Sequence, residues 1–122
     1  MDLLNNRHEL INALSGKTEE VKRLVDHALS NLDTAKVVTS DIKKIENTGN
    51  RDIAKQVAKI AIDNNPRDSF FIVQYGILAL KDGLIQEADE VLGEYKSTYG
   101  YPENNPRFKI LEAAICRHKK RL

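Results

Sequence analysis

The sequence predicts an all-α fold built from short antiparallel helical hairpins, and three observations indicate it. Residues 49–61 line up with residues 83–95 at an offset of 34 residues. Apolar residues recur at spacings of three and four along most of the chain, which is the period of one helix face. Charged residues make up 30% of the chain with both signs interspersed, and this suits the solvent-facing sides of helices better than a sheet.

The N-terminal part predicts a short helix over residues 2–14, ended at Gly16. Glycine just past a helix end adopts the left-handed conformation at little cost. Thr18 can cap a new helix, because its hydroxyl accepts a hydrogen bond from an amide of the first turn. From there a wide apolar stripe begins at Val21 and continues to Ile45.

Two interpretations of this stripe stay open. In one, helices at about 18–31 and 34–46 form a hairpin, since Asn31, Asp33 and Thr34 hint at a break. In the other, one helix of nearly 30 residues runs to Glu46 and supports a heptad repeat. The stripe is wider than a two-stranded seam, which favours packing within a bundle or repeat stack, with self-association of residues 1–46 as the alternative.

The aligned segments carry small residues at matching places. Gly49 aligns with Gly83, and Ala54 aligns with Ala88. A glycine lets the chain turn between two antiparallel helices without a Cβ clash, and the alanine marks the closest approach of those helices. We therefore expect helices at about 49–63, 68–81, 83–98 and 106–119.

These residues resemble the tetratricopeptide-repeat family, whose repeats are helix–turn–helix units of 34 residues. The resemblance covers roughly residues 35–119. In the family register the small residue of the first helix falls on Gly76, the turn glycine on Gly83 and the small residue of the second helix on Ala88.

The match to the family is partial. Ile72 stands where a large aromatic is usual, and the proline that closes a repeat occurs once, as Pro66. The resemblance implies a short right-handed stack of helical hairpins, an α-solenoid, over residues 48–122. An N-terminal amphipathic helical segment over residues 1–47 would precede it.

Composition narrows the classes of protein to consider. The net charge of +1 gives no global attraction to nucleic acid or membrane. Apolar runs are short, of which 77–80 is typical, so we expect no membrane-spanning helix. The start of the chain, Met1–Asn6, has neither the basic nor the apolar region of a secretory signal. The single cysteine, Cys116, excludes an internal disulfide framework and is expected in the core of the last helix. A cytoplasmic location is expected.

No catalytic motif is visible in the sequence. It lacks G-x-S-x-G, a phosphate-binding loop and H-E-x-x-H. Cys116 and His118 stand two residues apart, so on a helix they point to different faces and do not form a metal site. His27 is expected to be a solvated surface side chain. We therefore expect no enzyme activity, no cofactor and no metal.

The family resemblance implies an adaptor, chaperone or assembly factor that binds a segment of another protein. A groove between the helices at 68–81 and 106–119 would hold an extended peptide or a helix. The expected groove contacts are Arg67, Gln74, Tyr75, Lys81 and Arg107.

Two alternative functions come from other parts of the chain. The basic residues of the C-terminal run would contact phosphates in a nucleic-acid-associated protein; they are Arg117, Lys119, Lys120 and Arg121. The charge of these residues also complements the negative end of a helix dipole. The second alternative is a self-assembling structural protein, a homo-oligomer formed through residues 1–46.

Overall fold

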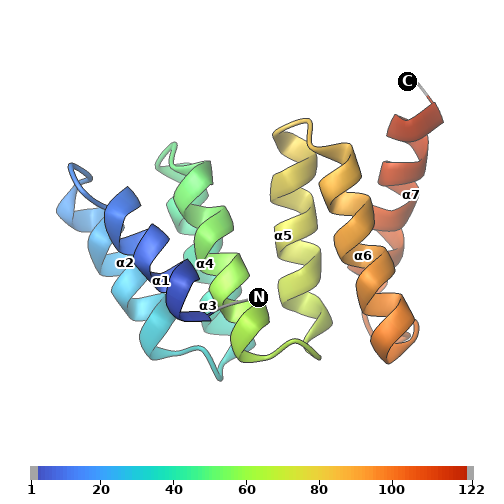
Figure 1. Ribbon diagram of the computed structural model, residues 1–122, viewed down its shortest axis with the longest axis horizontal. Helices are drawn as coiled ribbons and strands as arrows, with labels where there is room; N and C mark the ends of the chain where they lie inside the picture. The colour runs from blue at the N-terminus through green and yellow to red at the C-terminus, as the bar shows by residue number, and fades with distance from the viewer. Residues whose placement is uncertain (1–2, 121–122) are drawn as a thin grey trace. The chain divides into compact units, whose positions relative to one another are not determined.

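The computed structural model describes the backbone of residues 3–120 and the side chains of residues 7–120. That part of the chain contains seven α-helices and no strand, which confirms the all-α prediction. The helices are α1 (Leu3–Ala13), α2 (Glu19–Ser30), α3 (Ala35–Asn47), α4 (Arg51–Asn64), α5 (Ser69–Lys81), α6 (Ile85–Tyr99) and α7 (Pro106–Lys120) (Figure 1).

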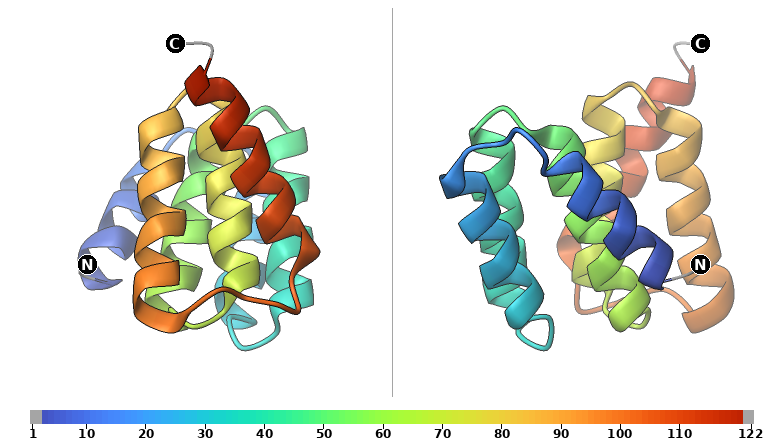
Figure 2. Two further views of the ribbon diagram at one scale, coloured as in Figure 1. Left: turned by 90° about the vertical axis from the view of Figure 1, so that its right-hand side faces the viewer. Right: turned by 60° about the vertical axis from the view of Figure 1, so that its left-hand side comes forward.

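The helices form two compact units, Met1–Pro66 (unit 1) and Arg67–Leu122 (unit 2). In unit 1, α2 packs against α3, α3 against α4, and both α1 and α2 against α4 (Figure 2, right). The helix expected at 49–63 therefore packs with the N-terminal helices, although the sequence suggested a boundary at residues 47 and 48. The core of unit 1 includes Leu10, Val21, Val25, Ala28, Val38, Ile42, Ile45, Ile53, Ala54 and Val57.

The stripe over residues 18–46 is a hairpin, so the single long helix is wrong. Helix α2 begins after Thr18, whose hydroxyl accepts a hydrogen bond from the Val21 amide at 3.4 Å. At the other end, the Asn31 side chain donates to the carbonyl of His27 at 2.7 Å. An asparagine that bonds its own helix in this way competes with helix continuation.

In unit 2, α5 and α6 form an antiparallel hairpin, and α7 packs against both. Figure 2 (left) shows α7 running obliquely across this hairpin. Asp68 caps α5 by accepting a hydrogen bond from the Phe70 amide at 2.9 Å. The core of unit 2 includes Phe71, Ile72, Leu78, Ala79, Ala88, Leu92, Phe108, Leu111 and Ile115.

The turns that follow α3 and α5 bear out the roles assigned to the two aligned glycines. Gly49 has φ of 87° and Gly83 has φ of 77°. Both values lie in the left-handed region, which a residue with a Cβ rarely adopts. The offset of 34 residues thus joins two turns of the same kind, one in each unit.

Candidate interaction groove

An apolar hollow of about 590 Å³ lies between α5 and α7 within unit 2. Its volume falls in the range of ligand-binding clefts. Most of the residues that line it are aliphatic, and three at its edges are basic. The lining residues are Ile77, Leu80, Lys81, Arg107, Ile110, Leu111, Ala114 and His118. We call this hollow the α5/α7 groove.

The floor of the groove is set by a close contact between α5 and α7. A Cβ built on Gly76 would lie 2.7 Å from Cδ2 of Leu111 and 3.2 Å from Cδ1 of Leu92. Real Cβ atoms do not come so close to a neighbour, so the absence of a side chain at Gly76 lets Leu111 pack directly onto the α5 backbone. This small residue, singled out in the sequence, therefore determines how closely α7 approaches α5.

Polar contacts join α7 to α6 at its middle and at its C-terminal end. Lys119 donates a hydrogen bond to Asp89 at 2.7 Å, and Lys96 forms an ion pair with Glu112. These hydrogen bonds raise the pKa of both lysine ammonium groups above the usual value. All four side chains are partly exposed, so the pairs orient α7 more than they stabilise it.

The loop before α7 is fixed by buried contacts to the start of unit 2. Asn105 is buried and donates from its side-chain amide to the Ser69 hydroxyl at 3.0 Å. The Tyr95 hydroxyl donates to the Arg67 carbonyl at 2.6 Å. The Asn105 bond joins the N-terminal ends of α5 and α7, and the Tyr95 bond joins the last part of α6 to the residues before α5. The groove therefore has a defined width at the N-terminal end of α7.

Ile110 is the most exposed apolar side chain of the groove, with 66% of its surface accessible. It lies one helical turn from Arg107 and Ala114, and all three line the same stripe of α7. The core side of α7 is taken by Phe108, Leu111 and Ile115. Ile110 and the partly exposed Ala114 thus give the helix a second, short apolar strip beside Arg107.

The edges of the groove carry two cationic side chains, Lys81 and Arg107, and one histidine. Arg107 lies in the first turn of α7, while Lys81 and His118 lie near the C-terminal ends of α5 and α7. Because α5 and α7 run in the same direction, these C-terminal ends lie at the same end of unit 2 (Figure 1). No acidic side chain is among the residues that line the groove.

Two of the five predicted contacts, Lys81 and Arg107, line the groove. Tyr75 and Gln74 do not: both are buried, and they are only 3% and 4% exposed. The Tyr75 hydroxyl donates to Glu87 on α6. Burial, reinforced by this carboxylate, raises the pKa of Tyr75 well above its usual value. The structure therefore does not place Gln74 and Tyr75 among the residues that line this groove.

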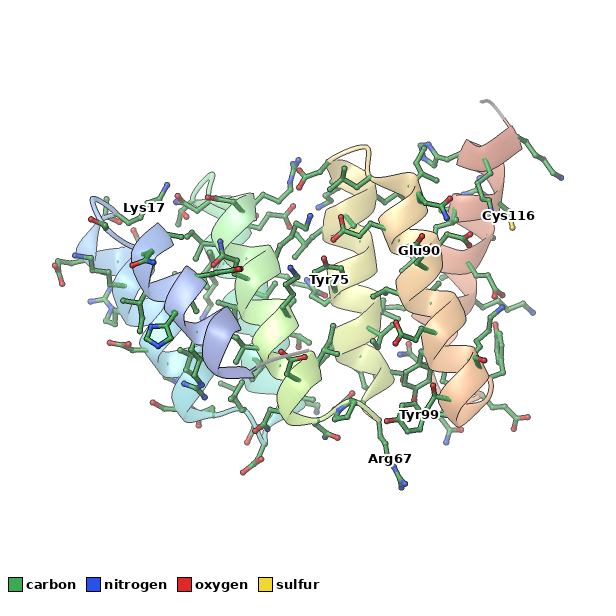
Figure 3. All side chains as sticks on the ribbon, viewed as in Figure 1. Lys17, Arg67, Tyr75, Glu90, Tyr99 and Cys116 are labelled. Atoms are coloured by element: carbon green, nitrogen blue, oxygen red, sulfur yellow. The ribbon has the colours of Figure 1, made fainter. Side chains whose placement is uncertain are left out.

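Arg67 lies away from the groove, at the end of unit 2 where α6 finishes (Figure 3). Its guanidinium carbon is 5.7 Å from the centre of the Tyr99 ring, within cation–π range. Tyr99 also packs on Tyr95, with ring centres 5.2 Å apart. Tyr99 and Arg67 therefore form a separate aromatic contact.

Sequence reasoning missed most of the groove's apolar lining. Ile77, Leu80, Ile110 and Ala114 lie off the core faces of α5 and α7. A signal was present, because α5 is apolar on more than one side and α7 carries two apolar stripes. His118 stands between the basic residues Arg117 and Lys119, and no feature of the sequence set it apart as a groove residue.

The remaining predicted residues lie at the end of α7. Arg117, Lys119 and Lys120 are exposed in its last turn, and Lys119 is paired with Asp89. Arg121 lies outside the described residues. Cys116 is exposed on α7 (Figure 3) rather than in the core, since it stands next to Ile115 and so faces about 100° away.

His27 is more than a solvated surface side chain. Its Nδ1 atom lies 2.6 Å from Oδ2 of Asp41, so the ring bridges α2 and α3. The His27 side chain is 57% exposed, whereas that of Asp41 is 3% exposed. The surface prediction for His27 holds for its exposure, but the ring also serves as the partner of a buried carboxylate.

Within residues 3–120, no helix has both the length and the apolar character that crossing a membrane demands. Among the described side chains, no group of three or more His, Cys, Asp or Glu is placed to hold a metal ion. Comparisons of the whole chain with protein-family models, curated proteins and solved structures found no match.

Proposed function

We propose that this chain is a non-enzymatic protein-interaction module, an adaptor, chaperone or assembly factor that holds a segment of another protein in the α5/α7 groove. The observation that carries the proposal is the exposed apolar stripe of α7 around Ile110, which lies above a hollow of about 590 Å³. Removal of apolar side chains from water by a partner is favourable, so apolar residues gathered along a groove provide free energy for binding.

We also propose that α5, α6 and α7 are a degenerate tetratricopeptide-like stack, with α5 and α7 as the first helices of successive repeats. Support comes from the left-handed Gly83 in the turn, the fully buried Ala88 and the tight contact at Gly76. In such a stack the groove between successive first helices is a concave face that holds extended or helical segments. With one exposed cysteine, Cys116, the protein suits a reducing compartment such as the cytoplasm.

Affinity capture from native lysate tests the proposed function. The tagged full chain is compared with Ile110→Asp and with Ile11→Asp, each with and without nuclease. Ile11 is a matched control, because it is 64% exposed and lies on α1 in unit 1. We expect a stoichiometric protein that the wild type and Ile11→Asp retain and that Ile110→Asp loses.

Other results would point to the alternatives. Loss of all captured material on nuclease treatment would favour nucleic-acid binding through Arg117 and Lys120. A complex that contains only further copies of this chain, and that Ile11→Asp abolishes, would favour self-assembly through residues 1–46. Either result would contradict the proposed use of the α5/α7 groove.

A further inference from the structure

We infer that the occupant of the α5/α7 groove is an amphipathic α-helix whose apolar ridge is flanked by acidic residues. This inference rests on the proposed function and specifies the chemistry of the partner. It is carried by two independent features of the groove, its helical periodicity and the sign of the charge at its edges.

The periodicity indicates a helical occupant. On α7 the groove is lined at positions i, i+3, i+7 and i+11, which are Arg107, Ile110, Ala114 and His118. This stripe is about 16 Å long at the rise of 1.5 Å per residue. Its two central residues, Ile110 and Ala114, are apolar and lie one turn apart, and residues at this spacing form the face that one helix presents to another, with ridges of side chains that fit between those of a neighbour.

The two helices that border the groove provide a seat for a third. Ile77 and Leu80 on α5 lie one turn apart, as Ile110 and Ala114 do on α7. A helix laid between them would contact both rows at once through one apolar ridge. An extended peptide places alternate side chains on opposite faces, so half of them would point away from this floor.

The basic side chains at the edges of the groove determine which charge is favourable beside the apolar ridge of the occupant. Lys81 and His118 border one end of the groove and Arg107 borders the other, and none of the lining residues is acidic. Acidic residues on either side of an apolar ridge would face these basic groups. Basic residues there would meet like charge, which disfavours the wrong partner and slows its association.

Synthetic peptides test both features against the full chain by fluorescence anisotropy. The first peptide has a leucine ridge with helical spacing and glutamate flanks. The second keeps the leucine ridge and replaces every glutamate with lysine. The third keeps the glutamates and replaces every leucine with serine. We expect the first peptide to bind at least about tenfold more tightly than either of the others, because ridge and flanks both contribute.

Charge-reversal variants test whether residues of the groove cause the preference for acidic flanks. Arg107→Glu should weaken binding of the glutamate peptide by roughly three- to tenfold and strengthen binding of the lysine peptide. Lys109→Glu is the matched control, because Lys109 is an exposed residue of α7 that does not line the groove. It carries the same change of charge and should alter either affinity by less than about twofold.

A fourth peptide tests the helical conformation of the occupant. It replaces one residue on the solvent side of the first peptide, outside the ridge and the flanks, with proline, which breaks a helix. The helical occupant predicts that this peptide binds at least about tenfold more weakly, because proline in a helix interior is strongly unfavourable. Equal binding of the two peptides would overturn the helical part of the inference.

The remaining outcomes separate failure of this inference from failure of the proposed function. Equal binding of the glutamate and lysine peptides, with both lost in Ile110→Asp, would overturn the acidic flanks and leave the groove as a binding site. Absence of binding by any peptide at millimolar concentration would overturn the inference, while protein capture through Ile110 would still stand. Concentration-dependent dimers that Ile110→Asp abolishes would show that the occupant is a second copy of this chain, and would also overturn it.

Discussion

At the scale of single residues, two glycines inside helices have opposite surroundings. A Cβ on Gly76 would collide with Leu111, whereas a Cβ on Gly93 would meet nothing within 4 Å. Gly76 thus serves the contact between α5 and α7, and Gly93 contributes only the flexibility of its backbone to α6. A substitution at Gly76 therefore measures the cost of overpacking, and a substitution at Gly93 measures the low helix propensity of glycine.

Substitutions at these glycines should change stability in opposite directions. We expect Gly76→Leu to lower the free energy of unfolding by about 1–3 kcal/mol, because the added side chain overpacks the contact with Leu111. Gly93→Ala should raise it by about 0.5–1 kcal/mol, since alanine is the better helix former. Urea unfolding followed by circular dichroism measures both, and stabilisation by Gly76→Leu would contradict the close contact.

The pairing of His27 with Asp41 predicts strong coupling between the two positions. His27→Ala leaves the buried Asp41 carboxylate without this partner, which should cost about 1–3 kcal/mol. The double variant His27→Ala/Asp41→Ala removes the buried charge as well, so it should be less destabilised than the sum of the two single variants. Additive effects in urea unfolding would show that the bridge between α2 and α3 contributes no coupling.

The raised pKa of Tyr75 predicts a loss of stability in alkaline solution. Burial and Glu87 keep its hydroxyl neutral in the folded state, while in the unfolded chain the tyrosine pKa is about 10. The stabilising contribution is therefore complete well below pH 10 and falls as the pH rises through that value. Wild type should lose stability relative to Tyr75→Phe between pH 9 and about 11, and parallel unfolding curves over this range would contradict the prediction.

At the scale of helices, α7 has three kinds of contact with the hairpin of α5 and α6. Phe108, Leu111 and Ile115 are buried against it, two ion pairs join it to α6, and the Asn105 amide anchors the preceding loop. Exposed ion pairs contribute little compared with a buried aliphatic side chain. Burial should therefore hold α7 in place, and the ion pairs should set its orientation.

Truncation of a core side chain of α7 should matter more than removal of an ion pair. We expect Ile115→Ala to cost about 2–5 kcal/mol, because it leaves a cavity beneath α7. Glu112→Gln keeps the shape of the side chain and should cost at most about 1 kcal/mol. Unfolding curves together with hydrogen exchange of α7 amides measure the difference, and comparable losses would show that the ion pairs hold the helix.

The positions of the helices could be predicted from the sequence better than the side of each helix that faces the groove. The 34-residue offset predicted the turns at Gly49 and Gly83 because turn chemistry is local. The break between α2 and α3 contains neither glycine nor proline, so the sequence left it open, and a side-chain bond from Asn31 marks it in the structure. In α5 most side chains are apolar, and periodicity alone did not show that Tyr75 is turned from the groove while Ile77 lines it.

At the scale of the whole molecule, the chain consists of two helical units, and each has a core of its own. The α5/α7 groove belongs to unit 2, and every residue that lines it lies between Ile77 and His118. Binding to this groove should therefore depend on unit 2 side chains. Surface changes in unit 1, such as Ile11→Asp, should have no effect on it, which is why that variant serves as the control.

The measurement that tests the central claim most directly is site-specific photo-cross-linking in native lysate treated with nuclease. A photoreactive amino acid replaces Ile110 in one protein and Ile11 in the other, two isoleucines of nearly equal exposure. The proposed function predicts a light-dependent adduct with another protein from position 110 and none from position 11. The glutamate-flanked leucine peptide should compete with that adduct. The same adducts from both positions, or none from position 110, would contradict a binding site in the α5/α7 groove.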